Sequence, residues 1–438
     1  MSDDYSHRAV WRIAAPMITS SVTVPLLGMV DTAVMGHLPE SYYLGAVAAG
    51  ATIFSVLFMG LNFLRMGTTG VTAQGYGAGD NAVVREALGQ SLLIAMLMAT
   101  LIIALQQPII EASLRLLAPS AEVSLYSREY FRIRVWSAPA SLANFVLIGW
   151  LLGMQNARGP LAIMLVINLT NIALDLVLVL LVGMTANGVA LATLLAELTG
   201  CATGAVFVRA ELRSHPGNWS QTRILAPARF KRLLNINANL FLRTMALMFV
   251  FAFVTAQGAR MGDVILAVNA LLMNFQLFLS YALDGIAYSA EALVGKAIGS
   301  RDRAGMLLAV RRSLQWSLLF SGLFCLVYLL AGGYIIDLLT SIDSIRVAAR
   351  EFLPWLIIAP LISVWSFLYD GVFVGATRSR EMMLIMVGSM LLIFLPAWFV
   401  SRTLGNHGLW LAFTLFMAAR GVGMSFWFRR ISVAPLGA

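Results

Sequence analysis

Twelve long apolar stretches limit what this chain can fold into. They run near residues 11–36, 44–72, 83–108, 124–154, 160–183 and 186–209, and again near 230–257, 263–294, 305–331, 346–375, 381–401 and 407–428. Each stretch has the roughly 20 residues that a helix needs to cross a bilayer. The chain is 60% hydrophobic and 12% charged, whereas a typical soluble protein carries about 25% charged residues. The sequence therefore predicts an all-α integral membrane protein with about twelve transmembrane helices.

The basic residues predict how these helices are oriented. Connections that follow an even-numbered stretch are basic, with Arg158, Lys296 and Arg378 as examples, whereas residues 36–44 and 183–188 contain neither Lys nor Arg. Because Lys and Arg accumulate in cytoplasmic loops, we expect both termini on the cytoplasmic side of a bacterial-type inner (plasma) membrane. The same rule accounts for the net charge of +9 without a nucleic-acid partner.

The chain also contains an internal repeat. Several residues recur 222 positions later, which pairs Gly36 with Gly258, Gly77 with Gly299, Asp80 with Asp302, Gly149 with Gly371 and Gly153 with Gly375 (375 − 153 = 222). Six helices in each half would give the two copies the same orientation, as in transporters built from parallel repeats. We predict two pseudo-symmetric lobes at residues 1–209 and 230–438, joined by a cytoplasmic linker at 210–229.

Charge breaks this symmetry. Asp31 and Asp175 align with the apolar residues Phe253 and, within a residue or two, Leu395. Duplicated scaffolding explains matching glycines, but it does not explain carboxylates that are present in one copy only. A carboxylate within a membrane span needs a partner, water or a proton. The first lobe is therefore predicted to be specialised for charge.

Residue spacing predicts which polar side chains meet. Spacings of three and four place Asn168, Asn171 and Asp175 on one helix face. Thr193 and Glu197, four apart, share a face of the next helix. If these helices meet the first one, Asp31, Asn171, Asp175 and Thr193 form one polar pocket. Two nearby carboxylates that cannot both ionise favour the binding of a proton.

Asn168 and Glu197 are candidates for substrate binding or gating, together with two further groups of residues. Pro16 and Pro25 each free a backbone carbonyl in the first helix, so this helix can bend as Asp31 changes protonation. In the second half, Asp284 and Asp370 have two interpretations. Either Arg243 forms a structural ion pair with one of them, or these carboxylates face a cavity and meet cationic substrates.

Several motifs carry a family resemblance. Residues 24–37, 73–79 and 370–377, together with the Asn171/Asp175 helix, resemble the multidrug and toxic compound extrusion (MATE) transporters, and most closely their DinF-type branch. The resemblance implies a V-shaped bundle of two six-helix lobes. It also implies that Asp31, Asn171, Asp175 and Thr193 are the cation-binding pocket and that Pro16 is the bending proline. Asp370 lies outside the context typical of the NorM branch, whose second-lobe Na⁺ site is therefore not transferred.

We accordingly expect a secondary active multidrug antiporter that exports amphipathic or cationic organic compounds in exchange for H⁺, with Na⁺ as the alternative ion. No Walker A loop, HExxH or Cys-x-x-Cys motif is present, so we expect no enzyme activity, no cofactor and no metal site. The expected partners are the lipid bilayer and small molecules, and the expected state is a monomer. A flippase for lipid-linked substrates, with a basic cavity, and an uncoupled channel or receptor are the alternatives.

Overall fold

A computed structural model describes residues 3–36 and 40–433. The side chains of Asp31 and Pro25, and a few others near them, lie outside the description. Every regular element in the described residues is a helix. Contacts between residues divide the chain into two units, which we call the N-terminal unit (Thr19–Leu234) and the C-terminal unit (Met1–Ile18 with Asn235–Ala438). The all-helical prediction is confirmed.

The predicted membrane spans correspond closely to these helices. Within the described residues, 11 stretches are long and apolar enough to cross a bilayer: Tyr42–Gly77, Asn81–Ala104, Ala121–Gly153, Arg158–Leu181, Ala186–Ser214, Pro227–Arg260, Asp263–Gly299, Arg303–Leu339, Asp343–Gly375, Ser379–Leu404 and Asn406–Ser432. Each matches one predicted stretch. The remaining stretch, 11–36, lies in helix α1 (His7–Met35).

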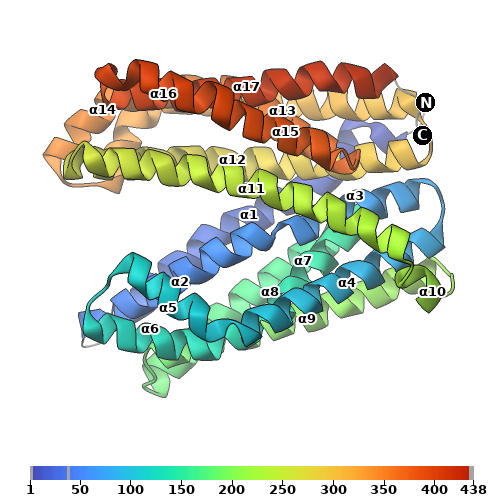
Figure 1. Ribbon diagram of the computed structural model, residues 1–438, viewed down its shortest axis with the longest axis horizontal. Helices are drawn as coiled ribbons and strands as arrows, with labels where there is room; N and C mark the ends of the chain where they lie inside the picture. The colour runs from blue at the N-terminus through green and yellow to red at the C-terminus, as the bar shows by residue number, and fades with distance from the viewer. Residues whose placement is uncertain (1–2, 37–39, 434–438) are drawn as a thin grey trace. The chain divides into compact units, whose positions relative to one another are not determined.

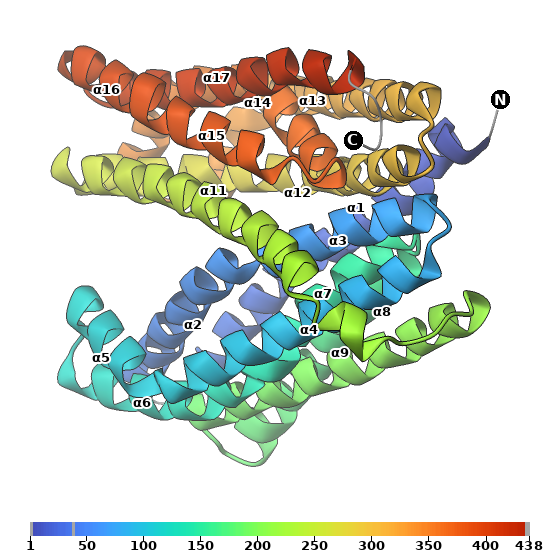
Figure 2. The same ribbon diagram turned by 45° about the vertical axis from the view of Figure 1, so that its right-hand side comes forward.

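The N-terminal unit contains the part of α1 from Thr19 onward and the helices that follow it (Figure 1). These are α2 (Ser41–Leu61), α3 (Phe63–Gly77), α4 (Asn81–Ala104), α5 (Gln106–Leu117), α6 (Ala121–Arg134), α7 (Ala138–Gly153), α8 (Arg158–Asp175), α9 (Ala186–Ser214), α10 (Gln221–Ile224) and the start of α11 (Pro227–Arg260). Helices α3, α4 and α7 all pack against one another, and α8 packs against α9 (Figure 2).

The sequence pattern missed two interruptions in this unit. Asn62 separates α2 from α3 inside one predicted span. The predicted stretch 83–108 ends early, because α4 stops at Ala104 and a separate short helix, α5, follows. In α5 Ile110 and Leu114 are buried, whereas Leu116 is exposed, so this helix lies on the unit with one apolar face inward.

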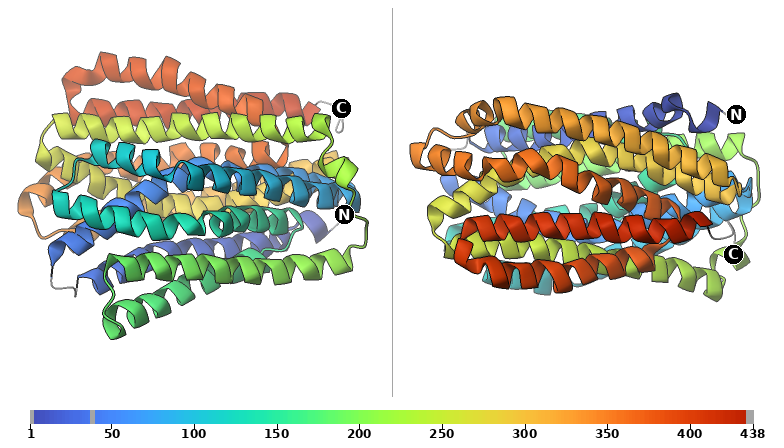
Figure 3. Two further views of the ribbon diagram at one scale, coloured as in Figure 1. Left: turned by 60° about the horizontal axis from the view of Figure 1, so that its bottom comes forward. Right: turned by 90° about the horizontal axis from the view of Figure 1, so that it is seen from above.

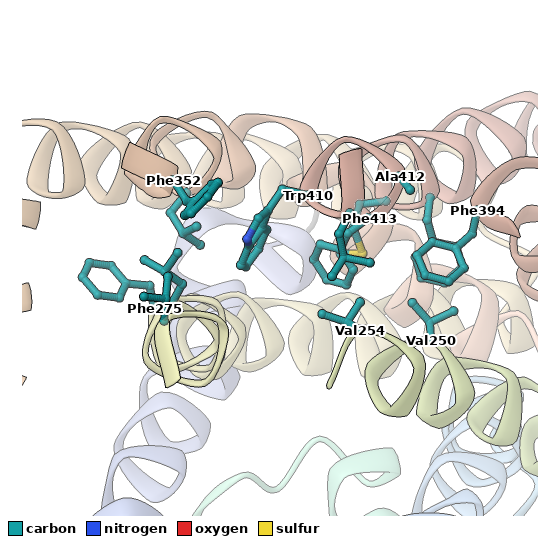
Figure 4. Packing of buried hydrophobic residues seen from close by; sticks show 14 of the residues in the cluster. Val250, Val254, Phe275, Phe352, Phe394, Trp410, Ala412 and Phe413 are labelled. Carbon is teal, nitrogen blue, oxygen red and sulfur yellow. The ribbon is translucent and has the colours of Figure 1, made fainter. Parts of the chain in front are cut away.

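The C-terminal unit contains the start of α1, the remainder of α11 and six further α-helices. These are α12 (Asp263–Gly299), α13 (Arg303–Leu339), α14 (Asp343–Gly375), α15 (Ser379–Ser389), α16 (Leu395–Ser401) and α17 (Asn406–Val433). The long helices of this unit run alongside one another (Figure 3). An aromatic core, including Phe275, Phe352, Phe394 and Trp410, fills the space between them (Figure 4).

The structure gives the internal repeat a physical basis. A Cβ on Gly149 would lie 2.4 Å from the Arg65 carbonyl oxygen, and one on Gly371 would lie 2.2 Å from the Ala287 carbonyl oxygen. Arg65 and Ala287, the residues that these two glycines face, are also 222 positions apart (287 − 65 = 222). Both units therefore use the same glycine to bring two helices into backbone contact, α7 on α3 and α14 on α12.

The paired aspartates also play the same role in the two units. Asp80 Oδ1 accepts hydrogen bonds from the backbone N–H groups of Ala82 and Val83, both at 3.0 Å, at the start of α4. Asp302 Oδ1 accepts one from the backbone N–H of Gly305 at 2.8 Å, at the start of α13. Each carboxylate caps the helix that follows it, which satisfies otherwise unpaired N–H groups.

Gly371→Ala is expected to destabilise the protein by about 1–3 kcal/mol, because the added methyl group meets a backbone carbonyl that cannot rotate away. The measurement is thermal or denaturant unfolding in detergent. Gly388→Ala is the matched control, since a Cβ there meets no atom within 4 Å. The control should be neutral or slightly stabilising. Equal stability of the two variants would contradict the close-packing role of Gly371.

Helix α1 belongs partly to each unit. It is continuous from His7 to Met35, and the division between the units falls between Ile18 and Thr19, two residues after Pro16. In the C-terminal unit, Gly285 of α12 lets α1 approach closely, because a Cβ there would lie 2.3 Å from Ile18 Cγ1. Trp11 packs edge-on against Trp316 of α13 at 4.9 Å. The lobe boundaries 1–209 and 230–438 stay predictions.

Candidate functional site

The polar face predicted on α8 is buried. Asn168, Asn171 and Asp175 are 6%, 2% and 0% exposed, whereas Leu169 between them is 64% exposed. This contrast is what spacings of three and four produce when one helix face turns inward. At Asp175 the α-helix ends, and the chain continues as a π-helical segment, Leu176–Leu181. Such segments are uncommon and are frequent at functional sites.

Neighbouring helices supply hydrogen-bond partners for this face. Asn168 Nδ2 donates to Thr23 Oγ1 of α1 at 2.6 Å. Asn171 Nδ2 donates to Thr193 Oγ1 of α9 at 3.5 Å, and the Thr193 hydroxyl donates to the backbone carbonyl of Val189 at 3.0 Å. The structure therefore brings α1, α8 and α9 together, as the pocket hypothesis requires.

Asp31 and Pro25 belong to α1, but their side chains lie outside the described residues. The backbone places Asp31 eight residues after Thr23. At a rise of 1.5 Å per residue, this is about 12 Å along the helix axis. The role of Asp31 in the pocket stays a prediction, as do the ion-binding roles of Asn171, Asp175 and Thr193.

Glu197 lies on α9, one turn after Thr193, and its partner is a residue that the sequence did not single out. The Glu197 carboxylate oxygen Oε2 accepts a hydrogen bond from Asn144 Nδ2 of α7 at 2.8 Å. The same nitrogen lies 3.0 Å from the backbone carbonyl oxygen of Glu197. The sequence did contain a signal for this partner, because Asn144 is an amide side chain within the apolar run 138–153.

In the C-terminal unit, Asp370 of α14 lies between two arginines. Arg243 of α11 and Arg420 of α17 both donate to Asp370 Oδ2, the second at 2.8 Å. The two arginines are 9% and 3% exposed. For Asp370 the geometry is therefore that of an ion pair, one of the two interpretations drawn from the sequence. Arg420 was missed, although an arginine within the apolar stretch 407–428 was a visible signal.

The charges around Asp370 are balanced. Asp284 of α12 interacts electrostatically with Arg420, so two carboxylates accompany two guanidinium groups. A buried charge is costly unless it is paired, so this balance is what permits two arginines inside a membrane-spanning unit. Four helices, α11, α12, α14 and α17, contribute one charged residue each.

Comparison with known proteins identifies similar chains. The family model described as MatE matches residues 16–177 and 240–399. The chain is 45% identical to the DNA damage-inducible protein F of Escherichia coli (strain K12) over 429 residues, which cover 97% of this chain and 92% of that protein. It is 24% identical to a probable multidrug resistance protein NorM of Rhizobium meliloti (strain 1021), covering 98% of this chain and 95% of that protein.

The fold is also similar to solved structures. One of them, described as the outward-facing conformation of a multidrug resistance MATE family transporter of the MOP superfamily, aligns with a TM-score of 0.88. The alignment covers 97% of this chain and 96% of that one, at 20% sequence identity. At this identity the comparison bears on the fold and not on individual site residues.

Proposed function

Because this chain belongs to the MATE family of membrane transporters, we propose that it is a secondary active multidrug efflux antiporter. It exports amphipathic, often cationic, organic compounds by alternating access and admits protons in exchange. The relatives that bear the name multidrug resistance protein support this substrate class. We further propose that it acts as a monomer in a bacterial inner membrane, with both termini in the cytoplasm and no cofactor.

The main observation that supports a coupled mechanism is the burial of Asp175 within a spanning helix. Its side chain is 0% exposed. An ionised carboxylate inside a bilayer costs about 2.5 kcal/mol or more. A group in this position gains from binding a cation, and releasing that cation changes the electrostatics of the helices around it.

The coupling ion that we propose is H⁺. A proton requires a single carboxylate, whereas a Na⁺ site requires several oxygens arranged around a fixed point. The oxygens of Asn171 and Thr193 make Na⁺ the alternative. We propose that protonation near Asp31 removes charge from the end of α1 and lets this helix bend at Pro16 and Pro25. Pro16 lies two residues before the division between the units.

An inward proton gradient is expected to drive efflux in Na⁺-free buffer, and Asp175→Asn is expected to weaken this drive. The amide keeps the shape of the side chain but cannot bind and release a proton. The measurement is transport of a cationic dye in proteoliposomes, with a pH step imposed and choline in place of Na⁺. Transport that begins only when Na⁺ is restored would assign the pocket to Na⁺ instead.

A flippase for lipid-linked substrates remains the rival proposal, because its cavity would be basic. Arg243 and Arg420 are the residues to consider, but Asp370 and Asp284 offset their charge. The balance favours the antiporter. In the same liposomes, movement of a fluorescent lipid without proton-driven dye transport would favour the flippase. Dye movement without any gradient dependence would favour an uncoupled channel.

A further inference from the structure

Glu197 is a carboxylate within a membrane-spanning helix whose direct partner is neutral. Its hydrogen bond comes from the Asn144 amide, and Ser141 of α7 lies beside it. An ionised carboxylate in this setting lacks the ion pair that usually compensates a charge inside a membrane. By contrast, Asp370 in the other unit receives two guanidinium groups. Glu197 therefore has the surroundings of a group that is stable without charge.

The other charged or titratable groups near Glu197 do not replace this partner. Arg134 of α6 interacts with Glu197 electrostatically, but its guanidinium donates to the Tyr130 hydroxyl and lies 4.7 Å from the centre of the Phe54 ring. Cys201 lies one turn away on α9. Helix α2 carries no Asp, Glu, Lys, Arg or His, and α8 contributes Asp175, on the face that meets Thr193.

Asn144 has an unused acceptor. It is 3% exposed, and its carbonyl oxygen Oδ1 is buried without a hydrogen-bond partner. Leaving such an atom unpaired is energetically costly. An ionised Glu197 cannot supply the missing donor, because a carboxylate only accepts hydrogen bonds, whereas a protonated one carries an O–H donor.

Protonation would complete the pair. The carboxylate takes up one proton and becomes a neutral acid, with no other bond made or broken. Its new O–H group donates to Asn144 Oδ1, while Asn144 Nδ2 continues to donate to the acid's other oxygen. A primary amide and a carboxylic acid form two complementary hydrogen bonds in this way.

We propose that Glu197 and Asn144 form a proton-binding site in the N-terminal unit that is separate from the pocket predicted around Asp31 and Asp175. Thr193 connects the two sites, because it lies one helical turn, about 5.4 Å, from Glu197 on the same face of α9. Gly200 permits the close packing here, since a Cβ on it would lie 3.2 Å from Asn144 Nδ2. The part that this site plays in transport rests on the proposed function.

The chain contains a matched control. Glu211 of α9 accepts a hydrogen bond from Asn156 Nδ2 at 2.7 Å, so it forms the same type of pair. The Asn156 carbonyl oxygen, however, already accepts from the backbone N–H groups of Arg158 and Gly159, both at 3.1 Å. The acceptor of this amide is already used, so Glu211 lacks the arrangement proposed for Glu197.

The test is infrared spectroscopy of the full-length protein in lipid nanodiscs at neutral pH, without Na⁺ or substrate. We expect a C=O stretching band from a protonated carboxyl group that is lost in Glu197→Gln and retained in Glu211→Gln and Asp175→Asn. Asn144→Leu should move this band to higher frequency, because the acid loses its hydrogen bonds to the amide. A spectrum that Glu197→Gln leaves unchanged, or a band that Asn144→Leu does not move, would overturn the inference.

The same set of variants separates this inference from the proposed function. Loss of the band in Glu197→Gln together with dye transport that requires Na⁺ would overturn proton coupling and leave the proton-binding site standing. Proton-driven transport in the wild type, with no band assignable to Glu197, would overturn the site and leave the function standing.

Discussion

Asp31→Asn is expected to abolish proton-coupled efflux and to leave the protein folded. Asp31 is the only carboxylate of α1 within the predicted span, and the repeat places Phe253 at the matching position of the second half. The amide preserves the shape of the side chain and removes its proton. Since the coupling ion would then have no group to neutralise on α1, transport should fall to the background of protein-free liposomes.

The measurement is dye transport in proteoliposomes under an imposed pH step, with folding checked by size-exclusion chromatography and thermal unfolding. Glu111→Gln is a suitable control, because the Glu111 side chain on α5 is 41% exposed and pairs with Arg128 of α6 at 2.8 Å. The control should transport like the wild type. Gradient-driven transport by Asp31→Asn at the wild-type rate would show that Asp31 does not carry the coupling ion.

Asp370→Leu is expected to reduce the free energy of unfolding by about 3–5 kcal/mol, the usual cost of removing one partner from a buried ion pair. Two guanidinium groups, those of Arg243 and Arg420, would then remain buried near each other with only Asp284 to offset them. The lost attraction and the uncompensated charge both lower the free energy of unfolding. The measurement is denaturant unfolding in detergent.

Asp337→Leu provides the comparison in the same unit. Asp337 pairs with Arg350 at 2.6 Å, but its side chain is 37% exposed, and surface pairs contribute about 0–1 kcal/mol. Replacing Asp370, Arg243 and Arg420 together by Leu, Met and Met should recover much of the stability, because no buried charge of the triad is then left unpaired. Equal losses for Asp370→Leu and Asp337→Leu would argue that the triad does not stabilise the unit.

Hydropathy and residue spacing were sufficient to predict several features of this protein. Eleven of the predicted spans correspond to described helices because a bilayer requires a long apolar run whatever the neighbouring helices are. The inward face of α8 followed from spacings of three and four, which depend only on helix geometry. The interval of 222 residues located glycines whose close contacts, at Gly149 and Gly371, are local to one helix pair in each unit.

The partners of the polar residues depended on tertiary structure. Asn168 meets Thr23, Glu197 meets Asn144, and Asp370 meets both Arg243 and Arg420, and each of these pairs joins residues at least 50 positions apart in the chain. Periodicity shows which way a side chain points from its own helix, but not which helix it faces. Helix packing determines that choice, and with it whether a carboxylate meets a cation, as Asp370 does, or a neutral amide, as Glu197 does.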